Sequence, residues 1–182
     1  MSDEIRSKVA ALMPTARDEL AELVAMRSVA DPRQFPPEEC VRAAEWVKDA
    51  FVGAGIGQVE LIETSDGSHA VVGHQPAPDG APTGLLYRHY HAQAPGHEKL
   101  WHTDPFTLTE RDGRWYGRGA ADCKGNIVMH LLALRALGTP FPVGIRIVAE
   151  GSEEMGTGGL ENLVVARPRL FYADMTLFVG PG

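Results

Sequence analysis

The sequence contains very few cysteines, since only Cys40 and Cys123 among its 182 residues carry a thiol. Two thiols cannot build a disulfide framework, and no Cys-x-x-Cys pair is present, which excludes zinc sites made of thiolates alone. We therefore expect the chain to belong to a reducing, cytoplasmic environment.

Long apolar runs and an excess of basic residues are also lacking. No run approaches the about 20 apolar residues of a transmembrane helix, and the first residues show no basic stretch leading into an apolar one. We therefore expect neither a membrane anchor nor a signal peptide. The 17 lysines and arginines are outnumbered by 24 aspartates and glutamates, which gives a formal net charge of -7. A protein that binds phosphate backbones needs a basic face, so nucleic acid is not an expected partner.

The order of apolar patterns predicts helices alternating with strands. Apolar residues at intervals of three and four predict helices over 5–24, 36–53 and 124–137, with a fourth after the glycines around 156–159. Short β-type runs predict strands at 59–62, 70–73, 85–90, 142–150 and 175–179, and a hairpin of 106–109 with 114–116. This alternation predicts one layered α/β domain over residues 1–182. The last strand would form an exposed edge of the sheet.

Two histidines stand where the third predicted strand ends. Ligands of open α/β sheets bind beyond the carboxyl ends of the strands, so polar residues at these places are candidates for function. The strand period of two puts His89 and His91 on the same side. Imidazole is the commonest metal-binding side chain, so the pair could form half of a metal site. Two exposed histidines at a strand end would give the same pattern.

Carboxylates follow at two further places of this kind. A loop punctuated by glycines, residues 116–126, delivers Asp122 to the start of a helix, either as a ligand or as the N-cap. Glu153 and Glu154 follow the buried strand 142–150. Hydrolytic two-metal sites need one carboxylate on a metal and another that is free to take a proton from water. Alternatively, the two glutamates simply favour the positive end of the following helix.

Taken together with Trp101, Pro105-Phe106, the stretch 110–125 and the stretch 150–154, these residues resemble a known family. The chain is similar to the co-catalytic zinc metallopeptidases that include carnosinase-type dipeptidases, acetylornithine deacetylase, succinyl-diaminopimelate desuccinylase and glutamate carboxypeptidase. Within this family, its motifs are most similar in sequence to those of the dipeptidase branch. The resemblance implies a three-layer α/β/α catalytic domain with a mostly parallel or mixed sheet. It also implies that the chain is the amino-terminal portion of that domain, without the lid domain and the carboxyl-terminal half.

The resemblance implies a role for each candidate residue. His89 binds one ion, Asp122 bridges two ions, Glu154 binds the second ion, and Glu153 is the general base. The ions would be zinc, with manganese or cobalt as alternatives. The substrate would be a dipeptide or an acylated amino acid, whose amide bond is hydrolysed. The partner could also be a second copy of the chain or a complementing carboxyl-terminal chain.

The sequence departs from the family pattern at three positions. His91 occupies the place of an aspartate that orients the metal-binding histidine, a loss of the kind that typically costs about 10- to 100-fold in metal affinity or activity. Arg88 replaces a glycine, and Gly180 stands where the dipeptidases carry a ligand aspartate. The distal histidine ligand of full members has no counterpart, although His91 or His97 could supply a replacement nitrogen.

The departures leave each ion below the usual three protein ligands. One ion would keep His89 and Asp122, and the other would keep Asp122 and Glu154. We therefore expect hydrolysis by this chain to be impaired. The first alternative is an inactive fragment that binds at most one divalent metal. The second is a cysteine hydrolase that uses Cys123 with His89 or His91.

Overall fold

A computed structural model describes residues 3–156 and 158–178 of the chain. Its centre is a five-stranded mixed sheet with the order β1-β2-β6-β3-β7. β1 and β2 are antiparallel to each other, β2 is antiparallel to β6, and β3 runs parallel to both β6 and β7. The bounds are Gln58–Glu63 for β1, His69–Gln75 for β2, Thr83–His89 for β3, Gly144–Glu150 for β6 and Met175–Leu177 for β7.

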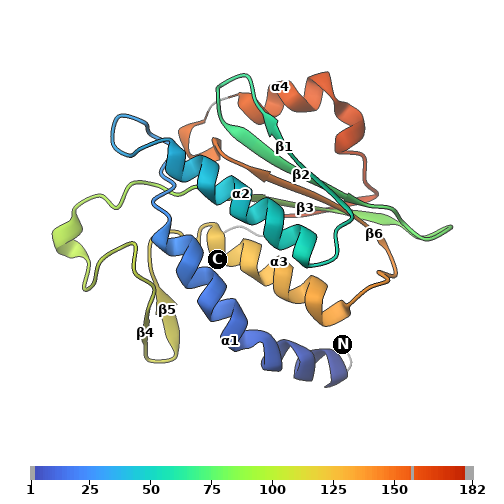
Figure 1. Ribbon diagram of the computed structural model, residues 1–182, viewed down its shortest axis with the longest axis horizontal. Coiled ribbons are helices and arrows are strands. Elements are labelled where there is room, and N and C mark those ends of the chain that lie inside the picture. Colours follow the sequence, from blue (N-terminus) through green and yellow to red (C-terminus); the bar gives the residue numbers. More distant parts are fainter. Residues whose placement is uncertain (1–2, 157, 179–182) are drawn as a thin grey trace.

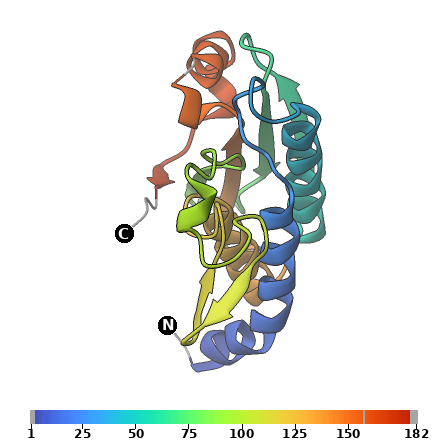
Figure 2. The ribbon, with the colours of Figure 1, turned by 90° about the vertical axis from the view of Figure 1, so that its left-hand side faces the viewer.

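Helices cover both faces of this sheet (Figures 1 and 2). The helices are α1 (Asp3–Ala25), α2 (Glu38–Gly53), α3 (Lys124–Leu137) and α4 (Gly159–Ala166). The larger core joins α1, α2 and α3 to alternate residues of β2 and β6, among them Val71, Ile147 and Ala149. The smaller core packs Leu163 of α4 against Ala70 and Val72 on the other face of β2. The three-layer α/β/α prediction is therefore confirmed.

Several local predictions are confirmed because their patterns are strong. β6 is buried along nearly its whole length, as its β-branched run indicates. α3 ends at Gly138, whose positive φ of 71° is a backbone conformation that glycine adopts at little cost. β7 lies at the edge of the sheet, and its three residues are exposed.

Two local predictions need correction. The hairpin begins later than expected, because β4 is Thr109–Arg111 and pairs with β5 (Arg114–Tyr116). Asp122 is not the N-cap of α3; that position belongs to Cys123, which makes no side-chain capping bond. The fourth helix was expected after the glycines, and α4 begins there, at Gly159; Glu153 and Glu154 lie before it in the short 3₁₀ helix η2 (Glu153–Met155), which ends at Gly156.

Two further 3₁₀ helices complete the described chain, η1 (Glu98–Leu100) and η3 (Pro168–Leu170). None of the helices built from the described residues combines the length and the apolar character needed to cross a membrane.

Candidate metal centre

The candidate residues converge because β3 and β6 end side by side. His89 at the end of β3 is in register with Glu150 at the end of β6. The chain after β6 turns directly into η2, which carries Glu153 and Glu154, and Asp122 precedes α3. The carboxyl ends of parallel strands are where open α/β sheets bind ligands. The fold therefore gathers side chains that are separated by up to 65 positions in the sequence.

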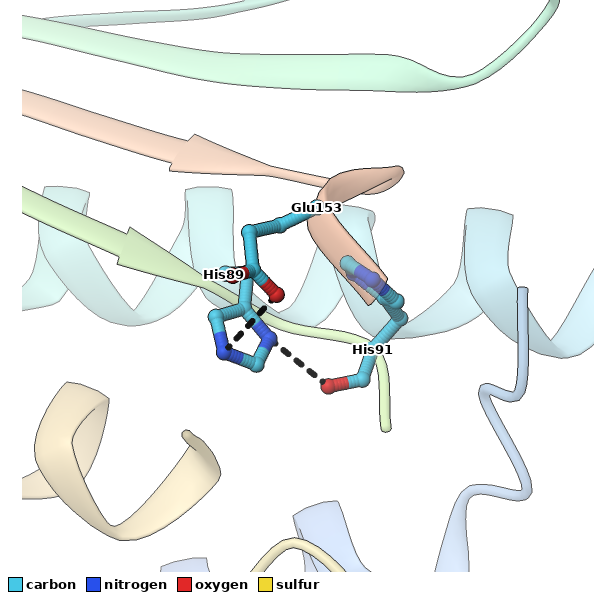
Figure 3. A group of neighbouring side chains, drawn as sticks. All are labelled: His89, His91 and Glu153. Atoms are coloured by element: carbon cyan, nitrogen blue, oxygen red, sulfur yellow. Dashed lines mark hydrogen bonds and ion pairs between the residues drawn. The ribbon is translucent and has the colours of Figure 1, made fainter. Parts of the chain in front are cut away.

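His89 is at the centre of the cluster (Figure 3). Its Nε2 atom lies 3.1 Å from Asp122 Oδ1 and 3.7 Å from Glu153 Oε2. The His89 ring is buried, whereas the side chains of Asp122 and Glu153 are 46% and 47% exposed. The cluster thus has a buried imidazole at its base and two carboxylates that reach solvent.

The orientation of His89 is set by the backbone. Its Nδ1 atom lies 3.1 Å from the carbonyl oxygen of His91, to which it donates a hydrogen bond (Figure 3). A carbonyl in contact with one ring nitrogen directs the other nitrogen toward a metal, as outer partners of metal-binding histidines do. In the family pattern, an aspartate at position 91 would orient the metal-binding histidine. Here the backbone carbonyl of His91 orients the His89 ring instead.

The surroundings of His89 favour a positive charge on its ring when no metal is bound. Burial lowers the pKa of His89, but the Cys123 thiol and the Glu153 carboxylate together outweigh burial and raise the pKa to about 9. Positive charge is therefore favoured at this point of the structure.

The side chain of His91 behaves differently, although it stands only two residues away. It is fully buried, and its Nε2 atom accepts a hydrogen bond of 2.9 Å from the backbone N–H of Glu154. Its Nδ1 atom lies 3.4 Å from the carbonyl of Glu150. Burial, followed by the charge of His89, lowers the pKa of His91 to about 3. His91 is therefore a neutral ring that fastens η2 to the end of β6.

The carboxylate of Glu154 does not join the cluster. Its Oε2 atom accepts a hydrogen bond of 2.7 Å from Gln93 Nε2. Among the described residues, the two groups whose ligand atoms all lie within 4.8 Å of one another are His89 with His91 and Glu153, and His89 with Asp122 and Cys123. Sequence reasoning missed Gln93, although its position two residues beyond His91 was a signal that could have found it.

Cys123 lies beside the metal-ligand candidates. Asn126 Nδ2 is 3.6 Å from its sulfur. Burial raises the pKa of the Cys123 thiol, but the neighbouring His89 outweighs burial, and the pKa lies below its ordinary value. The sequence suggested Cys123 as a nucleophile, whereas its location beside His89 and Asp122, with all three ligand atoms within 4.8 Å of one another, is also that of a metal ligand.

Arg88 points away from the cluster, because successive side chains of a strand alternate between faces. Its Nη2 atom lies 2.6 Å from His130 Nε2 on α3, and Nη1 lies 3.5 Å from the carbonyl of Leu177 on β7. The side chain that replaces the family's glycine therefore packs under α3. The other departure, Gly180, lies outside the described residues.

Known proteins resemble this chain in both sequence and structure. Residues 85–181 match the model of peptidase family M20/M25/M40. A cysteinylglycine-S-conjugate dipeptidase of Corynebacterium striatum is 43% identical over 171 residues, which are 90% of this chain and 36% of that protein. A beta-Ala-His dipeptidase of Mus musculus is 36% identical over 141 residues, or 70% of this chain and 28% of that protein.

The structural match is of the same kind. The crystal structure of human carnosine dipeptidase 1 superposes with a TM-score of 0.83 at 28% identity, over 96% of this chain and 40% of that one. The chain thus spans between a quarter and two fifths of the length of these relatives. The matched stretch contains His89, Asp122 and both glutamates of η2 and covers more than half of the chain. The chain therefore belongs to peptidase family M20/M25/M40.

Proposed function

We propose that this chain carries the ion-binding part of a dipeptidase active site, which uses zinc to hydrolyse the amide bond of a dipeptide or an acylated amino acid. The observation that carries the proposal is the cluster in which His89 Nε2 faces Asp122 Oδ1 at 3.1 Å and Glu153 Oε2 at 3.7 Å. The names of two relatives, a cysteinylglycine-S-conjugate dipeptidase and a beta-Ala-His dipeptidase, support a small peptide as the substrate.

The donor atoms of the cluster fit zinc. Imidazole nitrogen, carboxylate oxygen and thiol sulfur lie together at His89, Asp122 and Cys123. Zinc binds all three kinds of atom, and cobalt or manganese can replace it at many such sites, whereas calcium and magnesium prefer oxygen alone. Nitrogen and oxygen ligands of a tetrahedral zinc ion lie about 3.4 Å apart. The 3.1 Å separation of His89 Nε2 and Asp122 Oδ1 is close to this value.

Each side chain has a proposed role in the hydrolysis. His89 and Asp122 would hold one ion, and Asp122 is the residue that would be shared with a second ion. Glu154 is the proposed ligand of that second ion, after its carboxylate leaves Gln93. A bound divalent ion polarises the amide carbonyl and lowers the pKa of a bound water.

Glu153 is the proposed general base. Its carboxylate is half exposed and lies at the mouth of the cluster, where it can take a proton from water. The hydroxyl group of that water bonds to the carbonyl carbon, the carbon–nitrogen bond breaks, and Glu153 returns the proton to the departing amine. The products are a carboxylic acid and an amine, so one water is consumed for each bond cleaved.

Hydrolysis by this chain is proposed to be impaired. Within the described residues, the ligand atoms are gathered for one ion, while the carboxylate assigned to a second ion is bound to Gln93. The alternative, a fragment that binds one divalent ion without catalysis, differs only in the result of an activity assay.

A hybrid enzyme tests the proposal. In it, this chain replaces the matching part of the Corynebacterium striatum dipeptidase, and hydrolysis of Cys-Gly and β-Ala-His is measured with zinc. We expect the chain alone to remain near background and the hybrid to hydrolyse at least one dipeptide in a chelator-sensitive reaction. Glu153→Gln should abolish this reaction, whereas Glu161→Gln on the exposed face of α4 should preserve it.

Three outcomes would contradict parts of the proposal. A folded, zinc-loaded hybrid that cleaves neither dipeptide would reject the activity. Cleavage that survives Glu153→Gln would reject that residue as the base. Chelator-resistant cleavage that is lost in Cys123→Ser would favour the cysteine hydrolase instead, because a thiol nucleophile needs no metal.

A further inference from the structure

We propose that Cys123 is a metal ligand of this site, so that one ion is held by the imidazole of His89, the carboxylate of Asp122 and the thiolate of Cys123. The inference rests on the proposed function, because it names a third ligand for the same ion. It assigns Cys123 a binding role in place of the nucleophilic role that the sequence suggested.

The geometry of the three donor atoms carries the inference. The sulfur of Cys123, a ring nitrogen of His89 and a carboxylate oxygen of Asp122 all lie within 4.8 Å of one another. Sulfur and nitrogen ligands of a tetrahedral zinc ion are about 3.6 Å apart, given bond lengths of about 2.3 and 2.1 Å. Small side-chain rotations are therefore enough to bring the three atoms onto one ion.

Cys123 would complete the usual number of protein ligands for a zinc ion. Catalytic zinc sites usually have three protein ligands and one open position. His89 and Asp122 supply two, and Cys123 supplies the third. Glu153 then remains unligated at 3.7 Å from His89 Nε2, free to act as a base.

His91 is the competing third ligand, since it also lies near His89 and Glu153. Both of its ring nitrogens already face the backbone, Nε2 at 2.9 Å from the N–H of Glu154 and Nδ1 at 3.4 Å from the carbonyl of Glu150. Binding a metal through Nε2 would detach η2 from β6. The sulfur of Cys123 interacts with the ring of His89 and lies 3.6 Å from the amide of Asn126. Binding a metal through this sulfur would leave the backbone contacts of η2 in place, and the Asn126 contact can persist when a thiolate binds metal.

Burial of the thiol agrees with a ligand that faces inward. Cys123 is 4% exposed and His89 is 6% exposed, so nitrogen and sulfur would hold the ion from the protein side. The half-exposed carboxylate of Asp122 would close the site from the solvent side. The open fourth position is then directed toward solvent and substrate.

Cobalt(II) reports a thiolate ligand directly, without any measurement of activity. The metal-free chain is titrated with cobalt and followed by near-ultraviolet absorption, where thiolate-to-cobalt charge transfer appears. We expect the band in the unmodified chain and in Cys40→Ser, which removes the only other thiol. Cys123→Ser should lose the band and bind cobalt at least about 10-fold more weakly, and His89→Ala should lose cobalt binding.

X-ray absorption of the zinc-loaded Cys40→Ser chain provides a second readout that does not depend on a Cys123 variant folding. We expect one sulfur at about 2.3 Å from zinc. Binding that requires His89 but shows no charge-transfer band and only nitrogen and oxygen around zinc would overturn the role of Cys123 and leave the proposed function intact. An absence of any binding that depends on His89 would overturn both.

Discussion

His89 and His91 show how two identical residues on one side of a strand end acquire different properties. Cys123 and Glu153 raise the pKa of His89 to about 9, whereas burial lowers the pKa of His91 to about 3. The strand period alone predicts the same environment for both residues. The difference depends on the turn of the chain after β6, which brings the N–H of Glu154 to His91.

A first prediction concerns the side chain of His91. His91→Phe keeps a planar ring but removes the acceptor for the N–H of Glu154, and a buried N–H without a partner costs about 1 to 3 kcal/mol. We expect urea unfolding to show a loss of this size. His97→Phe, at an exposed position, is the control and should change stability by less than about 0.5 kcal/mol. If the two variants are equally stable, the hydrogen bond from Glu154 to His91 does not stabilise the position of η2.

A second prediction concerns the pH dependence of stability. Burial and the neighbouring Arg88 lower the pKa of His130 to about 4. Between about pH 6.5 and pH 4 the unfolded chain binds a proton that the folded chain does not, so stability falls as the pH falls through this range. His130 contributes up to about 1.4 kcal/mol per pH unit to this slope.

His130→Gln retains an acceptor for Arg88 but cannot titrate. We expect its unfolding free energy to fall less steeply than that of the unmodified chain between about pH 6.5 and pH 4. The exposed His102→Gln should keep the original slope. A His130→Gln slope indistinguishable from that of the unmodified chain would show that His130 titrates normally in the folded state.

At the scale of elements, Lys124 joins the start of α3 to the end of α1. The side chain is fully buried, and its Nζ atom donates hydrogen bonds of 2.8 and 2.7 Å to the carbonyls of Leu23 and Met26. Carbonyls at a helix end have no partner within the helix. Lys124 therefore satisfies the end of α1 and fixes the loop that carries Asp122 and Cys123.

A third prediction follows from this tie. Lys124→Met fills a similar volume but removes both of these hydrogen bonds. The carbonyl of Leu23 keeps the backbone N–H of Met26 at 3.2 Å, whereas the carbonyl of Met26 loses the donor from Lys124. We therefore expect a loss of about 1 to 3 kcal/mol in urea unfolding and faster hydrogen exchange at the end of α1. Lys99→Met in η1 is the matched control, because Lys99 is exposed. If the two lysine variants are equally stable, the hydrogen bonds of Lys124 to Leu23 and Met26 contribute nothing to the free energy of unfolding.

Most elements could be predicted from the sequence because their apolar periods are regular. The helices near 5–24 and 124–137 and the strand near 142–150 match α1, α3 and β6 within a few residues. Contacts between distant residues could not be predicted in this way. The partnership of Glu154 with Gln93, the direction of Arg88 toward α3 and the approach of Cys123 to His89 all depend on how the elements pack.

Over the whole molecule, one group of exposed apolar residues lies in and beside β7. Tyr172, Met175 and Phe178 are 64%, 58% and 69% exposed, and Leu177 and Val165 lie nearby in the sequence with exposures of 48% and 82%. β7 is also an edge strand that pairs with β3 alone among the described strands. Edge strands with apolar surfaces tend to join other chains.

A fourth prediction is that the isolated chain associates with itself through β7. We expect sedimentation velocity to show oligomers that grow with concentration, and Leu177→Lys to shift the distribution toward monomer. Val52→Lys, which changes a residue of similar exposure on α2, should leave association unchanged. A monodisperse monomer at every concentration of the unmodified chain would contradict this prediction.

Zinc titration of the metal-free chain by calorimetry is the decisive measurement on the ion-binding cluster. We predict about one bound ion per chain, lost or weakened by more than about 10-fold in His89→Ala and Asp122→Ala, because even outer partners of a metal site contribute that much. Glu153→Gln, which alters the proposed base and not a ligand, should bind zinc with nearly unchanged affinity. Zinc binding that is unaffected by His89→Ala would contradict the account.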